Sequence, residues 1–107
     1  MATPAAYAYM RVPCDIPDAK VRRMEYELRH FAEDKGFQLA AIFPEFECGR
    51  FEAFADLLQE LQRAEAHVVI VPTFRHLARN TLLQNMLLNR LETQAHAEVF
   101  ALVETLG

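Results

Sequence analysis

Four consecutive apolar residues, Val68-Val69-Ile70-Val71, constrain the fold of this chain more than any other stretch. A short, fully apolar and β-branched run is typical of a strand that is buried on both faces, as in a parallel sheet covered by helices. Pro72 follows directly and ends the strand, because proline has no backbone N–H to offer a neighbouring strand. The sequence therefore predicts a central strand of an α/β fold over residues 68–71.

The segment that follows this strand in the sequence is rich in basic residues, with Arg75, His76 and Arg79 within five positions. In open α/β sheets, ligands bind just beyond the carboxyl ends of the strands. We therefore expect an anion-binding site at this point. The alternative is a solvated basic loop whose charges are balanced by acids such as Glu45 and Glu47.

Strands and amphipathic helices alternate along the rest of the chain. We expect strands at residues 6–12, 37–43, 68–71 and 99–103. Pro13 and Pro44 close the first two. Three helices are expected between these strands. The first is expected to end near Gly36, the second to begin near Phe51, and the third to cover residues 81–93. This order predicts an α/β fold with a mainly parallel four-stranded sheet and helices on both faces.

The expected helix over residues 81–93 carries more apolar side chains than one buried face requires. Its leucines and Met86 spread over roughly 240° of the circumference, whereas a one-sided surface helix needs a stripe of about 100°. We therefore expect part of this helix to contact a protein partner or a second copy of the chain. The residues expected at that interface are Leu83, Leu87, Leu88 and Leu91.

Length and charge exclude several classes of protein. A chain of 107 residues is expected to form a single domain with its own core. It has no apolar run near the ~20 residues that cross a bilayer, and its first residues do not resemble a secretory signal, so we expect a cytoplasmic protein. The net charge of -4 argues against a free-standing nucleic-acid binder, although a local basic pocket is compatible with it.

Cys14 and Cys48 do not have the spacing of a metal-binding pair, and we expect neither a metal nor a cofactor. A reducing compartment would keep both cysteines as thiols. The three glycines are isolated, so the chain has neither a Gly-x-Gly-x-x-Gly turn nor a Walker loop for nucleotides.

Four ordered segments carry a resemblance to a known family. Tyr9-Met10-Arg11-Val12 resembles the Tyr-x-Arg-Val-Ser opening of the resolvase/invertase family of serine recombinases. Glu45-x-x-Cys48-Gly49 is similar to the Glu-x-x-Ser-Gly loop of that family, and Asp56-Leu57-Leu58-x-x-Leu61 resembles the helix behind it. The stretch 68–80 resembles Val-Leu-Val-Val-x-x-Leu-Asp-Arg-Leu-Gly-Arg-Ser/Asn. The resemblance covers residues 6–104.

This resemblance implies the catalytic-domain fold of the family, in which a serine attacks a DNA phosphodiester while arginines hold the phosphate. Arg11 and Arg79 match two of those arginines, but the serine position is occupied by Pro13. The Asp-Arg pair of the family falls on Arg75-His76. A further family arginine aligns with Phe51, or with Arg50 after a shift of one residue. Strand exchange through a covalent intermediate is therefore expected to be lost.

The two cysteines leave further chemistry open. Cys14 follows the lost serine position and could act as a substitute nucleophile, or it could be a buried and inert residue. Cys48 occupies the position of the family's loop serine. The resemblance would place both sulfur atoms near one rim, where they could pair or react with an oxidant.

We expect residues 1–107 to form one resolvase-like domain, without the long dimerising helix or helix-turn-helix module of the family. The interpretation we prefer is a catalytically inactive domain that serves as a binding, regulatory or assembly module and contacts DNA only weakly or within a larger assembly. The alternative is a diverged enzyme of DNA strand exchange or other phosphoryl transfer that uses Arg11, Arg79 and His76. A remnant without a selected role is a third possibility.

Overall fold

The computed structural model describes residues 3–46, 52–78 and 80–103. In chain order its elements are β1 (Ala5–Val12), α1 (Asp18–Asp34), β2 (Gln38–Phe46), α2 (Ala53–Ala64), β3 (Val68–Val71), the short 3-10 helix η1 (Phe74–His76), α3 (Thr81–Ala95) and β4 (Glu98–Ala101). Within these ranges no helix has the length and apolar character that crossing a membrane requires.

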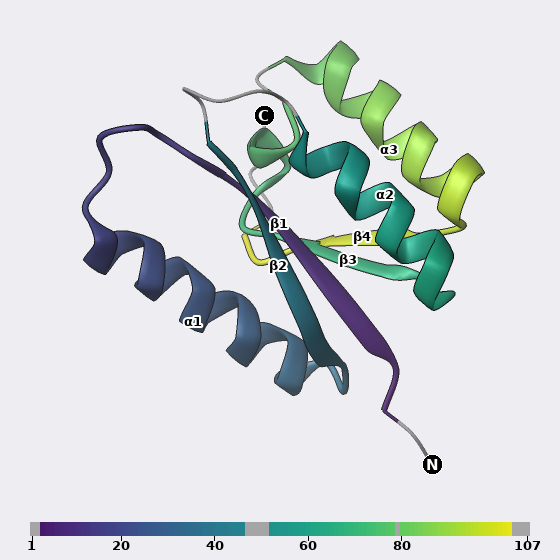
Figure 1. Ribbon diagram of the computed structural model, residues 1–107, viewed down its shortest axis with the longest axis horizontal. Helices are drawn as coiled ribbons and strands as arrows, with labels where there is room; N and C mark the ends of the chain where they lie inside the picture. Colours follow the sequence, from purple (N-terminus) through teal and green to yellow (C-terminus); the bar gives the residue numbers. More distant parts are fainter. Residues whose placement is uncertain (1–2, 47–51, 79, 104–107) are drawn as a thin grey trace.

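The strands form one sheet in the order β2-β1-β3-β4, and each neighbouring pair is parallel. Helix α1 covers one face of this sheet, while α2 and α3 cover the other (Figure 1). The predicted fold class, a parallel α/β sheet with helices on both faces, is confirmed.

The central strand β1 divides its side chains between two cores. Tyr7 and Tyr9 pack on the side of α2 and α3, whereas Ala8 and Met10 pack on the side of α1. This division follows from the alternation of side chains along a strand. By the same alternation, Arg11 belongs to the side of α2 and α3.

The apolar run that predicted β3 is buried as expected. The strand lies between β1 and β4 in the sheet, and the side chains of Val69, Ile70 and Val71 have no exposed area. It ends at Val71, directly before Pro72. Residues 72–78 therefore begin at the carboxyl end of the sheet, as the sequence indicated.

The expected end of the second strand at Pro44 is wrong. Strand β2 continues to Phe46, and Pro44 pairs with Met10 within it. The reason is that β2 lies at an edge of the sheet, where a residue without an N–H can be accommodated. The longer strand brings Glu45 opposite Arg11.

Asn80 caps the N-terminus of α3, because its side chain accepts a hydrogen bond from the N–H of Leu83 (2.8 Å). Its apolar side chains are divided between core and surface. Leu91 has no exposed area and belongs to the core, so its expected place in an interface is wrong. The large apolar side chains that α3 does expose are Leu82, Leu83 and Met86, at 72%, 46% and 54%.

Candidate anion-binding site

Arg11, near the carboxyl end of β1, is fixed to the segment that follows β3. Its backbone N–H donates to Nδ1 of His76 (2.9 Å), and its Nη2 donates to the carbonyl oxygen of Leu77 (3.1 Å). Accepting the first bond leaves Nδ1 of His76 without a proton, so the proton of a neutral ring is on Nε2. These bonds join residues that lie 65 and 66 positions apart in the sequence.

A cavity of about 430 Å³ opens beside this junction. It is lined by Arg11, Pro13, Ile16, Met24, Thr73, Arg75 and His76. The structure thus brings together three of the four residues predicted to bind an anion, while Arg79 lies outside the described residues. Guanidinium and imidazole N–H groups are donors suited to the oxygens of a phosphate or sulfate.

Thr73 is a lining residue that the sequence reasoning missed. It lies two positions beyond β3 and is half-buried. Its position between Pro72 and Arg75 was the available signal, since polar side chains at the end of a buried parallel strand face the ligand-binding edge. Its hydroxyl adds a donor and acceptor to the cavity.

Glu45 is buried beneath this edge and is held by α2. Its carboxylate accepts hydrogen bonds from the hydroxyl of Tyr9 (2.9 Å) and from the backbone N–H groups of Phe54 (3.3 Å) and Ala53 (3.4 Å). The last two are at the start of α2, where a negative charge is favourable. Burial, together with the bond to Glu45, raises the pKa of Tyr9 well above its usual value.

This geometry bears on the alternative in which acids balance the basic loop. The Glu45 carboxylate is directed to Tyr9 and the α2 terminus. The other acid considered, Glu47, lies outside the described residues. Arg11 and Glu45 both line a second cavity of about 320 Å³, whose walls include Phe54 and Leu77, so Arg11 stands between two cavities.

The position where the family opening has serine is occupied by an exposed Pro13. Cys14 is exposed and disulfide-bonded, which differs from the expectation of a thiol. In this state its sulfur cannot act as the attacking thiolate. The second cysteine, Cys48, and the positions Arg50 and Phe51 lie outside the described residues.

Comparisons with known proteins agree with this fold. A family model described as the resolvase N-terminal domain matches residues 6–106. Among curated proteins, none matches the sequence.

Two solved structures are similar to the chain. The first is the C-terminal catalytic domain of ISC1926 TnpA, an IS607-like serine recombinase, with a TM-score of 0.79 and 15% identity over 94% of this chain and 72% of that one. The second is the N-terminal catalytic domain of TP901-1 integrase, with a TM-score of 0.74 and 17% identity over 92% of this chain and 76% of that one. At such identities the likeness shows a shared fold.

Proposed function

Because this chain belongs to the resolvase N-terminal domain family, we propose that it is a recombinase-type domain that binds phosphate groups without cleaving DNA and serves as a binding, regulatory or assembly module. The observation that carries the proposal is the cavity in which Arg11, Arg75 and His76 meet beside Pro13. Donors for an anion are retained there, while the residue at the serine position has no hydroxyl.

Phosphoryl transfer through a covalent intermediate requires a nucleophile near the phosphorus atom. Pro13 cannot supply one, and the sulfur of Cys14 is held in a disulfide. Arginine forks bind phosphate oxygens whether or not a reaction follows. The cavity therefore supports binding more directly than catalysis.

Binding is tested by thermal unfolding against increasing phosphate, with sodium chloride of equal ionic strength as the reference. An anion that binds only the folded protein raises the melting temperature by an amount that grows with its concentration relative to its dissociation constant. We expect this rise for the wild type and its loss in an Arg75→Ala variant and in an Arg11→Ala, Arg79→Ala double variant.

Arg75 is exposed, so its replacement tests the site with little effect on folding. Arg22→Ala, at an exposed position of α1, is the matched control and should keep the response. Equal responses in all four proteins would contradict the proposal.

The second candidate is a diverged enzyme that uses Arg11, Arg79 and His76, and the hydroxyl of Thr73 in the same cavity favours its consideration. We expect no reaction. Incubation with supercoiled or nicked DNA, followed by denaturation and electrophoresis, should show no covalent protein–DNA adduct. An adduct formed by the wild type would establish the enzyme instead, and its absence in Thr73→Val would then identify the attacking hydroxyl.

A further inference from the structure

The outer edge of β4 is open within the described part of the chain, because β4 lies at the end of the sheet and pairs there with β3 alone. The backbone N–H groups of Glu98 and Leu102 donate toward β3, to His67 (2.9 Å) and Val71 (3.0 Å). Successive residues of a strand turn their N–H and C=O groups to opposite sides, so Val99 and Ala101 direct theirs away from β3. An edge of this kind is a template for pairing with another strand.

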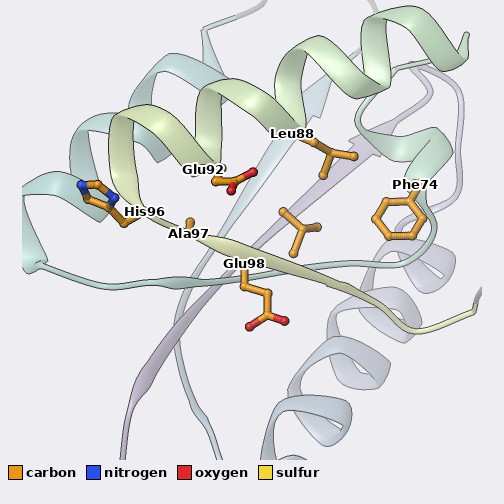
Figure 2. Close-up of a pocket in the computed structure, with 7 residues that line it drawn as sticks. Phe74, Leu88, Glu92, His96, Ala97 and Glu98 are labelled. Atoms are coloured by element: carbon orange, nitrogen blue, oxygen red, sulfur yellow. The ribbon is translucent and has the colours of Figure 1, made fainter.

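A groove of about 610 Å³ runs beside this edge, between α3 and β4. Leu88, Phe74 and Val99 form an apolar part, and each of the three is half-buried. Figure 2 shows Glu92 reaching from α3 into the space between the helix and β4, whereas Glu98 points to the opposite side of the strand. A strand added to β4 would therefore place alternate side chains in this groove.

Acidic groups flank both sides of the edge. Glu92 and Glu98 are exposed, and neither has an ion pair with another described residue. Within the described ranges there is also no group of three or more Asp, Glu, His or Cys side chains that could hold a metal ion. The charge on both sides of β4 therefore suits cationic side chains.

We propose that the outer edge of β4 binds an extended, basic and apolar peptide segment of a partner protein as an added strand. Residues i and i+2 of such a strand face the same side and lie about 6.7 Å apart. On the α3 side, a basic residue would lie near Glu92 and an apolar one against Leu88 and Val99. On the other side, a basic residue would lie near Glu98 and an apolar one near Phe100.

The binding motif that fits is two adjacent basic residues next to two adjacent apolar residues. Main-chain hydrogen bonds to Val99 and Ala101 would supply affinity, and the side-chain contacts would supply selectivity. A second copy of this chain fits less well, because residues 98–107 contain two glutamates and no lysine or arginine. The same composition argues against residues 102–107 as the added strand.

The test uses two blocked, fluorescein-labelled peptides, Thr-Lys-Lys-Val-Val-Thr and its reverse sequence, with fluorescence anisotropy at low salt as the measurement. The two sequences cover parallel and antiparallel pairing. We expect one of them to bind saturably to the wild type. Replacing both lysines with glutamates, or N-methylating alternate peptide nitrogens, should abolish binding, because the first reverses the charge and the second removes main-chain donors.

Protein variants locate the site. Glu92→Lys should weaken binding roughly tenfold, since it converts a partly exposed attraction into a repulsion. Glu33→Lys makes the same change at an exposed position of α1 and should leave the affinity unchanged. Ala101→Pro, which removes an outward N–H from the edge strand, should abolish binding while circular dichroism confirms the fold.

Several results would overturn the proposal. The first is that neither peptide binds. The second is that the N-methylated peptide binds as tightly as the unmethylated one. The third is that Glu33→Lys loses as much affinity as Glu92→Lys, which would indicate non-specific attraction to an acidic protein. Self-association of the wild type that disappears in Ala101→Pro would assign the edge to a second copy instead. The N-methylated peptide leaves the protein unaltered, so the backbone test holds even if Ala101→Pro does not fold.

Discussion

Tyr9 and Glu45 form a buried pair beneath the candidate anion site. The hydroxyl of Tyr9 donates to a carboxylate that also caps α2, so the pair connects β1, β2 and the start of the helix. A hydrogen bond to a buried charged acceptor contributes more to stability than one between neutral groups. This pair therefore stabilises the contact between β1 and β2 near their carboxyl ends, where Arg11 lies opposite Glu45.

A pH dependence follows from the raised pKa of Tyr9. The folded protein holds the phenolic proton more tightly than the unfolded chain, whose tyrosine pKa is close to 10.0. The stability that Tyr9 contributes is thus complete below pH 10 and is lost as the pH rises above that value. We expect urea unfolding between pH 8 and pH 11 to show this loss, which Tyr9→Phe should reduce.

The same substitution should lower stability at pH 8 by roughly 1 to 3 kcal/mol, because Glu45 loses one of its donors. Tyr26→Phe, at a tyrosine that is 65% exposed, is the matched control and should change neither quantity. An unaltered pH dependence in Tyr9→Phe would show that other groups cause the alkaline loss.

At the scale of single residues, the end of a buried parallel strand predicted Arg75 and His76 at the ligand-binding edge, and the family resemblance added Arg11 to them. The sequence could not predict the bond between the Arg11 N–H and Nδ1 of His76, which depends on the path of η1. Nor could it place Glu45 under Tyr9, because this required β2 to continue past Pro44.

Among the elements, α3 differs most from its expected role. Apolar periodicity correctly indicated more apolar surface than one core-facing stripe needs, but it could not decide which leucines turn inward. That choice depends on how α3 packs beside α2 and β4, and it buries Leu91 while Leu82, Leu83 and Met86 stay exposed. The large apolar side chains that this helix exposes thus lie in its first two turns.

We expect α3 to mediate weak self-association through this exposed face. Replacing Leu83 with glutamate should reduce association measured by sedimentation at micromolar concentration, since each buried leucine contributes about 1.5 to 3 kcal/mol. Asn89→Glu, at an exposed polar position of the same helix, is the control for added charge. A wild type that is monomeric at every concentration would leave this face without the expected role.

For the whole molecule, the parallel pairing of the strands and the layers of helices followed from simple patterns. Buried β-branched runs separated by amphipathic helices require parallel neighbours, and the structure has them. Among the strand ends, the two that were wrong belong to the edge strands: β2 continues past Pro44 to Phe46, and β4 ends at Ala101 instead of Val103. An edge strand has one neighbour, so its limits are set less by local residue preference than by how far that neighbour extends.

The arrangement of β1 also bears on how the chain folds. β1 is made first, yet its partner on one side, β3, is separated from it by more than half the length of the chain: Tyr7 pairs with Val69. A parallel sheet without hairpins offers no strand pair that can close locally, and long-range closures slow folding. During synthesis, the apolar side chains of β1 therefore stay exposed until β3 has been made. In this period the nascent chain can bind chaperones or misassemble.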